Sequence, residues 1–347
     1  MTVSLRDTTV ARPPALEVRG LCKSFGGRRG IFSGKGDTVH AVSDVDFAVQ
    51  EGQTLGIVGE SGCGKSTTAR LILRLTVPDS GEVRVQGDLV SADDKATLKR
   101  LRGAIQMVFQ DSYASLNPRL TVGETVMFGP RVQGRSAEEA ADIADDILAK
   151  VGLDPARFAD RFPHELSGGQ RQRVNIARAL SFAPSIVIMD EPVSALDKSV
   201  EAQVLNLLCD LRERLKLTYV FISHDLNVVR YIADHVLVMY LGKVVEVAPS
   251  NLAFSQPQHP YTRALVASAP SLNPDRRTTV APMTGDLPSP LNPPSGCRFR
   301  TRCGFAEEIC ARVEPVLAGA GDHPSSLVAC HMARAESGHS RGGRLDG

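Results

Sequence analysis

The fold is decided by the stretch GESGCGKS at residues 59–66, which matches the phosphate-binding loop pattern in full. Its glycines let successive backbone N–H groups turn toward phosphate oxygens, and a helix behind the loop adds its positive end. Lys65 would reach the β- and γ-phosphates, and the Ser66 hydroxyl would bind Mg²⁺. An apolar run at residues 54–58 precedes the loop, and helical spacing over residues 67–75 follows it. The predicted nucleotide contacts are Gly59, Ser61, Gly62, Gly64, Lys65, Ser66 and Thr67.

Outside this loop, short apolar strands alternate with helices. The β-branched runs at residues 185–189 and 219–223 are typical of buried strands in a parallel sheet. Residues 136–151 have the spacing of an amphipathic helix, with Ser136 as its N-cap. Residues 39–49 alternate apolar and polar side chains, which indicates an edge strand. This order of elements predicts an α/β fold.

Two carboxylates, Asp190 and Glu191, follow the apolar run at residues 185–189. An Asp at the tip of a buried strand beside a phosphate loop can bind Mg²⁺, directly or through water. The neighbouring Glu191 could activate the attacking water as a general base. An apolar run followed by Asp-Glu is a weak signal alone, so its weight comes from the motifs around it.

The motif Leu-Ser-Gly-Gly-Gln at residues 166–170 resembles the signature of ATP-binding cassette (ABC) ATPases. A glycine-rich helix start is the plainer interpretation of the same residues. In the functional interpretation, Ser167 and the amides of Gly168 and Gly169 form an anion site for a γ-phosphate, with Gln170 completing the motif. The resemblance implies a P-loop (RecA-like) ABC nucleotide-binding domain with a helical subdomain at about residues 111–180. It also implies that the signature of one subunit completes the phosphate-loop site of another.

Further residues match ABC motifs in the order the family has them. Gln110 matches the Q-loop glutamine, Asp197 the D-loop aspartate and His224 the switch histidine, while Phe25 matches the aromatic residue that stacks on adenine. The resemblance implies ATP and Mg²⁺ as cofactors. The catalytic residues it implies are Lys65, Glu191 and His224, and the Mg²⁺ ligands are Ser66, Gln110 and Asp190.

The C-terminal part carries motifs of a narrower group. The segments QHPYT (258–262) and GDLPSPLNPPSGCRFRTRC (285–303) resemble the C-terminal region of dipeptide, oligopeptide and nickel importer ATPases. We therefore expect an ABC domain at residues 16–256, an importer-type Cys-rich extension at 257–335, and flexible tails at 1–15 and 336–347.

This resemblance implies an ATPase that powers import of di- or oligopeptides from the cytoplasmic face of the inner membrane. The partners it implies are a second ATPase subunit, in a heterodimer, with two integral membrane permease subunits and an extracytoplasmic solute-binding protein. Nickel or another small solute is the alternative cargo. A rival of another class is a non-transport ABC ATPase that regulates the ribosome or acts on nucleic acid, and a purely structural ATP-binding subunit is a third interpretation.

Four of the seven cysteines, Cys297, Cys303, Cys310 and Cys330, gather near the C-terminus. In a cytosolic protein such a group of cysteines indicates metal ligands more than disulfides. Four thiolates suit tetrahedral Zn²⁺ or a [4Fe–4S] cluster. The resemblance implies a [4Fe–4S] cluster, with Zn²⁺ as the second interpretation and unligated or disulfide-bonded cysteines as the third.

Composition limits the remaining possibilities. The 347 residues are 42% hydrophobic and 23% charged, which is ordinary for a globular chain. The net charge of +1 argues against a strongly basic nucleic-acid binder, so we expect no nucleic-acid partner. No run of apolar residues is long enough for a membrane-spanning helix and the N-terminus has no signal peptide, so we expect a cytosolic chain that binds the membrane complex peripherally.

Overall fold

The computed structural model of the chain describes residues 13–26, 38–90, 95–269, 285–320 and 323–343. Within them, eight strands form the main sheet: β3 (Thr54–Val58), β6 (Ile105–Val108), β7 (Ile186–Asp190), β8 (Thr218–Ile222), β9 (His235–Tyr240), β10 (Lys243–Pro249), β11 (Ala318–Ala320) and β12 (His323–Val328). Their spatial order is β11-β12-β10-β9-β3-β8-β7-β6. The central strands from β9 to β6 are parallel, whereas β10, β12 and β11 add antiparallel neighbours.

The parallel strands explain the position of the predicted motifs. Strands β3, β7 and β8 are buried along their whole length, as their apolar runs predict. Carboxyl ends of parallel strands meet at one edge of a sheet, which is where ligands bind in open α/β folds. The phosphate loop follows β3, the Asp190–Glu191 pair ends β7, and His224 follows β8, so the topology brings these motifs to the same edge.

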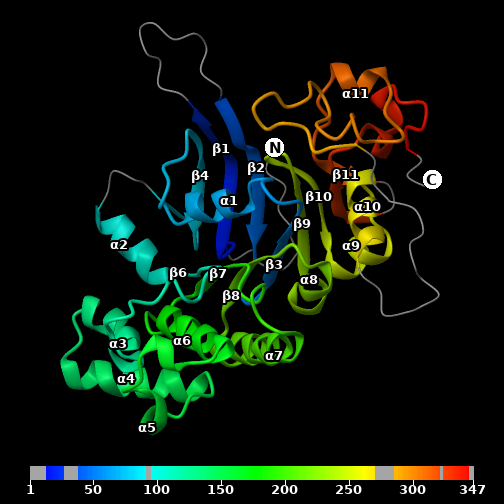
Figure 1. Cartoon of the computed structure of the whole chain (residues 1–347). Helices are drawn as coiled ribbons and strands as arrows, with labels where there is room; N and C mark the ends of the chain where they lie inside the picture. Colours follow the sequence, from blue (N-terminus) through cyan, green and yellow to red (C-terminus); the bar gives the residue numbers. More distant parts are fainter. Residues whose placement is uncertain (1–12, 27–37, 91–94, 270–284, 321–322, 344–347) are drawn as a thin grey trace, which may run out of the picture.

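A second, antiparallel sheet covers one side of this arrangement (Figure 1). Its strands are β1 (Leu16–Gly26), β2 (Thr38–Val49), β4 (Ser80–Val85) and β5 (Asp88–Leu89), in the order β2-β1-β4-β5. The strand predicted at residues 39–49 is therefore an edge strand. Apolar side chains of both sheets, including Leu16, Ile57 and Val220, share one hydrophobic core.

The α-helices of the described residues are α1 (Lys65–Ile72), α2 (Lys95–Ala104), α3 (Val122–Val132), α4 (Ala137–Lys150), α5 (Pro155–Phe158), α6 (Gly168–Leu180), α7 (Lys198–Leu215), α8 (Leu226–Ile232), α9 (Ser250–Ser255), α10 (Pro260–Ser268) and α11 (Glu308–Arg312). Ser136 caps α4 in a capping box with Glu139, as its sequence predicts. Helix α1 begins at Lys65 and ends at Ile72, earlier than the predicted 67–75, and Arg74 beyond its end is left-handed at φ 52°.

Helices α3 to α6 form a group at one end of the molecule, away from the antiparallel sheet (Figure 1). Helix α3 packs on α4 and α6, and α6 packs on α7. Their apolar faces join a second hydrophobic core that contains Val126, Leu148 and Val174 and reaches β8 through Phe221. This group lies within the range expected for a helical subdomain.

The QHPYT motif anchors the C-terminal part to the main sheet. The backbone N–H groups of Gln258 and His259 donate to the buried carboxylate of Glu246 on β10, at 2.9 and 2.8 Å. His259 then accepts from the N–H of Tyr261 at 3.0 Å and so caps α10. Burial lowers the pKa of His259 to about 3, which keeps the ring neutral and able to accept.

The C-terminal extension also continues the main sheet, because β12 pairs with β10 and β11 pairs with β12. The boundary at residues 256–257 stays a prediction, and both proposed domains contribute strands to one sheet. Within residues 336–343, which are expected to belong to a flexible tail, His339 is buried and bonds the Phe305 carbonyl at 2.9 Å. Residues 1–12 and 344–347, which belong to the two expected tails, lie outside the described residues.

No helix among the described residues is long and apolar enough to span a membrane.

Candidate nucleotide site

The phosphate loop connects the end of β3 to the start of α1, and its glycines are required by close contacts. A Cβ atom at Gly59 would lie 2.2 Å from the Met239 carbonyl oxygen, and one at Gly64 would lie 2.3 Å from that of Ala41. Both residues also have positive φ, at 150° and 107°. The backbone can therefore turn tightly between two neighbouring strands only because these positions lack side chains.

Lys65 and Ser66, the first residues of α1, connect the loop to the acidic end of β7. The buried Lys65 Nζ donates to the carbonyls of Gly59 at 2.7 Å and Glu60 at 3.0 Å. The Ser66 hydroxyl donates to Asp190 Oδ1 at 2.9 Å. Burial raises the pKa of the Asp190 carboxyl, and the nearby Glu191 charge adds to this, while the Ser66 hydrogen bond opposes it. A divalent cation beside this carboxylate would offset the cost of burying its charge.

Glu191 is the centre of the next contacts. Its Oε2 accepts from Gln110 Nε2 at 2.9 Å, and its Oε1 lies 3.2 Å from His224 Nδ1. The three side chains come from the ends of β6, β7 and β8, which are adjacent in the sheet. Glu191 itself has a left-handed backbone, at φ 50°, an unusual conformation that is found at functional sites. The structure thus brings the predicted Q-loop, general-base and switch residues together around one carboxylate.

One pocket collects most of the predicted nucleotide contacts. Its lining residues are Phe25, Val39, Ala41, Ser61, Gly62, Gly64, Lys65, Ser66, Thr67, Gln110, Glu191 and His224. Phe25, at the end of β1, is 43% exposed, and Lys23 lies over its ring at 5.6 Å. An exposed aromatic ring at the mouth of a phosphate-loop pocket can stack on a base. Val39 and Ala41 on β2 were missed by the sequence reasoning, because no local pattern shows that Val39 pairs with Phe25 or that the Ala41 carbonyl lies beside Gly64.

The signature residues do not line this pocket. Ser167 caps α6 in a capping box with Gln170, with Oγ accepting from the Gln170 N–H at 3.3 Å. Gly168 and Gly169 begin the helix, and a Cβ atom at Gly169 would lie 2.4 Å from Val200 Cγ1 on α7. The lack of a side chain at Gly169 therefore lets the signature helix approach the helix that follows the D-loop.

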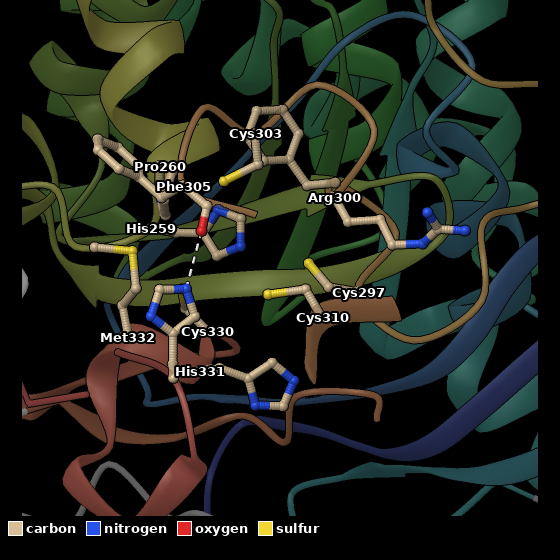
Figure 2. A pocket seen from close by; sticks show the side chains of 12 residues that line it. His259, Pro260, Cys297, Arg300, Cys303, Phe305, Cys310, Cys330, His331 and Met332 are labelled. Atoms are coloured by element: carbon tan, nitrogen blue, oxygen red, sulfur yellow. Dashed lines mark hydrogen bonds between the residues drawn. The ribbon is translucent and has the colours of Figure 1, made fainter. Parts of the chain in front are cut away.

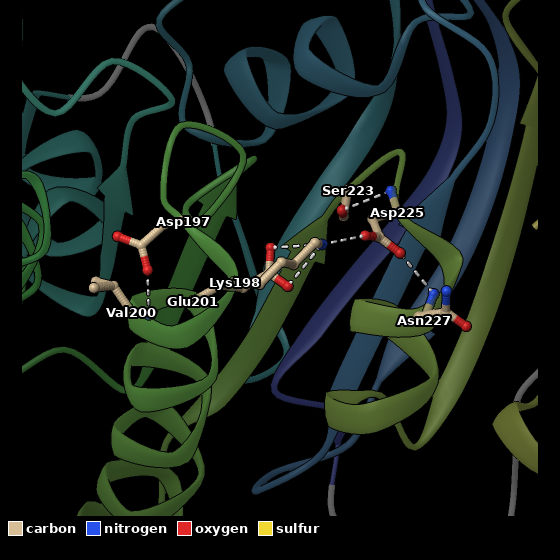
Figure 3. Close-up of polar contacts among 7 residues, drawn as sticks. All are labelled: Asp197, Lys198, Val200, Glu201, Ser223, Asp225 and Asn227. Carbon is tan, nitrogen blue, oxygen red and sulfur yellow. Dashed lines mark hydrogen bonds and ion pairs between the residues drawn. The ribbon is translucent and has the colours of Figure 1, made fainter. Parts of the chain in front are cut away.

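The D-loop is joined to the switch region by charged side chains, as Figure 3 shows. Asp197 caps α7 and accepts from the Val200 N–H at 2.9 Å. Lys198 Nζ bridges Glu201 at 3.0 Å and Asp225 at 3.1 Å, and Asp225 directly follows His224. Lys198 is 76% exposed, so each pair contributes little to stability. These contacts connect the D-loop with the residue that follows the switch histidine.

Helix α6 also contacts the segment after Gln110, a connection that the sequence reasoning missed. Asn175 on α6 is fully buried, and its Nδ2 donates to the Ser112 carbonyl at 3.0 Å. Arg178 on the same helix donates to the Ser115 carbonyl. These contacts tie the segment after Gln110 to the helix that starts at the signature. An Asn between Val174 and Ile176, in an apolar part of the helix sequence, was the available signal for such a contact.

The four C-terminal cysteines lie around one small pocket, which residues at the start of α10 and residues from the range 297–339 line (Figure 2). Burial raises the pKa of Cys297 to about 12 and of Cys330 to about 11, and it also raises that of Cys303. These thiols are therefore protonated at neutral pH. Among the described residues, no group of three or more His, Cys, Asp or Glu side chains is placed so that it could hold a metal ion. The cysteines share a pocket without forming a ligand set.

Comparison with known proteins agrees with this geometry. A family model described as ABC transporter matches residues 42–194, and one described as oligopeptide/dipeptide transporter, C-terminal region, matches residues 245–310. The fold and the site define an ABC ATPase, an enzyme that hydrolyses ATP. The "Probable peptide ABC transporter ATP-binding protein y4tS" of Sinorhizobium fredii is 48% identical over 91% of this chain and 89% of its own length. The chain belongs to the family of peptide ABC transporter ATP-binding proteins.

Other relatives are similar over nearly their whole length. The oligopeptide transport ATP-binding protein AppF of Bacillus subtilis is 46% identical, over 94% of this chain and 99% of AppF. The dipeptide transport ATP-binding protein DppF of Haemophilus influenzae is 46% identical, over 95% of this chain and 99% of DppF.

Solved structures of cassettes are also similar. CbiO1 from Clostridium perfringens, part of the cbiONQ transporter complex, has a TM-score of 0.61 at 27% identity, over 70% of this chain and 92% of that one. The cassette MJ0796, as a dimer bound to ADP and Pi, has a TM-score of 0.58 at 30% identity, over 68% of this chain and 98% of that one.

Proposed function

We propose that this chain is the ATP-hydrolysing subunit that powers import of di- or oligopeptides across the cytoplasmic membrane. The observation that carries the proposal is the match of residues 245–310 to the oligopeptide/dipeptide transporter C-terminal region, beside a cassette with its motifs intact. Relatives named for oligopeptide and dipeptide transport align over nearly the whole chain. The chain works peripherally at the cytoplasmic face, with two integral membrane permease subunits and an extracytoplasmic solute-binding protein.

Each residue of the pocket has a role in this proposal. Lys65 and the loop amides bind the phosphates, and Phe25 stacks on the adenine. Ser66, Asp190 and Gln110 hold Mg²⁺, for which the Ser66–Asp190 contact and the raised pKa of Asp190 are the support. Bound there, Mg²⁺ neutralises charge on the β- and γ-phosphates. Glu191 orients and deprotonates the attacking water, and His224, 3.2 Å from Glu191, stabilises the γ-phosphate.

The position of the signature supports a site shared between two subunits. Ser167, Gly168 and Gly169 present a helix start that can bind an anion, and they do not line the pocket of their own chain. A second ATPase subunit would bring its own signature to Lys65 and receive this one in return, with Asp197 near the contact. We propose a heterodimer, in which dimer closure moves the permease and hydrolysis resets it.

Reconstitution tests the importer function. The full chain, its second ATPase subunit, the permease pair and the binding protein in proteoliposomes are expected to translocate a radiolabelled dipeptide or oligopeptide only when ATP is present. Translocation of ⁶³Ni²⁺ without any peptide would assign the alternative cargo. Co-sedimentation of the native chain with ribosomes or DNA, and not with membrane proteins, would contradict the importer proposal.

The cysteine pocket carries a separate proposal, that Cys297, Cys303, Cys310 and Cys330 hold a [4Fe–4S] cluster, with Zn²⁺ as the alternative. Its support is that all four line one pocket. In this structure they are not arranged as a ligand set, so binding a metal requires both their deprotonation and their rearrangement.

Metal analysis decides among these occupants. Protein purified without oxygen is expected to contain about four iron and four sulfide per chain, and Cys310→Ser is expected to lose both. Zinc in place of iron would establish the alternative. If the protein contains neither metal, the four cysteines are free thiols and the cluster proposal is wrong.

A further inference from the structure

The C-terminal extension contacts the phosphate loop through an arginine. The guanidinium of Arg302 forms two hydrogen bonds with the carboxylate of Glu60, at 2.8 and 3.1 Å. The two side chains are only 8% and 23% exposed. Paired hydrogen bonds between arginine and a carboxylate fix direction as well as distance. Glu60 is the second residue of the phosphate loop, so the extension holds that loop in one position.

A second contact reaches the same loop residue. The backbone N–H of Glu60 donates to the Tyr261 hydroxyl at 2.9 Å. Tyr261 is fully buried, and its ring packs 4.6 Å from the ring of Tyr240 and 5.4 Å from that of Phe299. Tyr261 belongs to the QHPYT motif, and Phe299 to the segment between Cys297 and Cys303. Glu60 is therefore held at its side chain and at its backbone, both times by residues C-terminal to the cassette.

A third contact supports the middle of the loop through a neighbouring turn. Arg298 donates to the Leu241 carbonyl and to the Ser43 hydroxyl, the latter at 3.0 Å. The next residue of that turn, Gly242, donates its N–H to the Cys63 carbonyl at 2.8 Å. Arg302 directly, and Arg298 through the Leu241–Gly242 turn, thus support the loop at Glu60 and at Cys63. Both arginines belong to one short segment, residues 297–303, which we call the CRFRTRC segment.

We propose that Arg302 and Tyr261 are positioning residues, through which the extension holds the phosphate loop in its ATP-binding shape. The proposal rests on the proposed binding of ATP at this loop. Lys65 also bonds the Glu60 carbonyl, and it must turn toward phosphate when a nucleotide binds. The Arg302 and Tyr261 contacts keep Glu60 in place when Lys65 leaves. A loop that is already ordered loses less entropy on binding, so its affinity is higher.

The CRFRTRC segment also connects the phosphate loop with the cysteine pocket. Cys297 and Cys303, its first and last residues, both line that pocket, and Phe299 lines it as well. A change in the pocket that moves this segment therefore moves Arg302 relative to Glu60. A ligand of the cysteine pocket whose binding depends on the position of this segment therefore changes the affinity of the chain for ATP. By thermodynamic linkage, ATP changes the affinity for that ligand by the same factor.

Calorimetric titration of the full chain with ATP tests the proposal. We expect Arg302→Ala to raise the Kd for ATP about fivefold or more, within the usual range of coupling between sites. Arg302→Lys is expected to recover part of the loss, because lysine keeps the charge without the paired hydrogen bonds. The matched control is Arg312→Ala, since Arg312 forms an exposed ion pair with Glu308 on the same extension. It should leave the Kd unchanged.

Two further measurements separate positioning from folding. Tyr261→Phe removes one hydroxyl and keeps the ring, and it is expected to weaken ATP binding about threefold, as expected for one hydrogen bond. Tyr219→Phe removes a buried hydroxyl that donates to the Leu208 carbonyl far from the loop, and it should not weaken binding. In a double-mutant cycle, adding Glu60→Gln to Arg302→Ala should cost little more than either change alone, because both remove the same contact.

Two outcomes contradict the proposal. In the first, Arg302→Ala lowers the melting temperature of the nucleotide-free chain but binds ATP like the wild type well below that temperature. In the second, the losses from Arg302→Ala and Glu60→Gln add in full. If the wild-type chain does not bind ATP, the proposed function is wrong as well. If the wild type binds ATP, Lys65→Ala does not, and Arg302→Ala binds it like the wild type, only the positioning role is rejected.

Discussion

Glu191→Gln is expected to lower the ATPase rate of the assembled transporter by about a hundredfold or more, the effect of removing a general base. The Glu191 carboxylate lies between Gln110 and His224, at 2.9 and 3.2 Å, at the edge of the nucleotide pocket. Glutamine has the same shape and can still interact with both neighbours, but its amide cannot accept the proton of an attacking water. Steady-state phosphate release by the reconstituted complex measures the effect.

ATP binding provides the internal check on this variant. Glu191→Gln is expected to keep the wild-type Kd for ATP within about threefold, because no phosphate contact is assigned to Glu191. Glu138→Gln is the matched control: Glu138 lies in the first turn of α4 and does not line the nucleotide pocket. A variant at Glu191 that hydrolyses ATP near the wild-type rate would overturn the general-base role and leave the ATP site itself intact.

Local patterns in the sequence were sufficient to predict the phosphate loop. Its glycines, its lysine and its serine are consecutive, and the apolar run before them coincides with β3 (Thr54–Val58). The Ser136 cap and the carboxylates at the end of β7 could be predicted for the same reason, since each depends on neighbours within a few residues. Parallel strand order then brings Gln110, Glu191 and His224 to one edge, a consequence of fold class alone.

Contacts between distant parts of the chain could not be predicted this way. Glu60 occupies a variable position of the loop motif, and Arg302 is one of several arginines near the cysteines. Their pairing depends on how β12 joins β10 and how α10 packs, which no periodicity encodes. The spacing of the cysteines likewise suggests a shared ligand, whereas the side-chain positions show a shared pocket without a ligand set.

The cassette and its extension are therefore linked in structure at the point where ATP binds. The extension adds strands to the main sheet, and its Arg302 reaches the phosphate loop. Removing residues from 257 onward would expose β10 and take away Tyr261 as well as Arg302. Point variants are consequently better tests of the loop than truncations, because they leave the sheet and its core intact.

Lys65→Ala is expected to raise the Kd for ATP between about tenfold and a hundredfold, the usual loss for a hydrogen bond to a charged group. Lys65 Nζ is buried against the loop, with the Gly59 and Glu60 carbonyls at 2.7 and 3.0 Å, and it would turn from these carbonyls toward phosphates bound at the same loop. The alanine variant loses this cation at the point of highest negative charge. Calorimetric titration of the full chain with ATP measures the change.

Lys65 has a second role in the nucleotide-free chain, because its hydrogen bonds to the Gly59 and Glu60 carbonyls hold the loop together. If that were its only role, Lys65→Ala would lower the melting temperature without ATP and leave the Kd for ATP unchanged. Lys150→Ala is the matched control, since Lys150 pairs with Asp146 on α4 and does not line the pocket. It should alter neither quantity by much, because an exposed pair of this kind contributes roughly 0.5 kcal/mol. A large loss of ATP affinity in Lys65→Ala alone therefore assigns Lys65 to the phosphates.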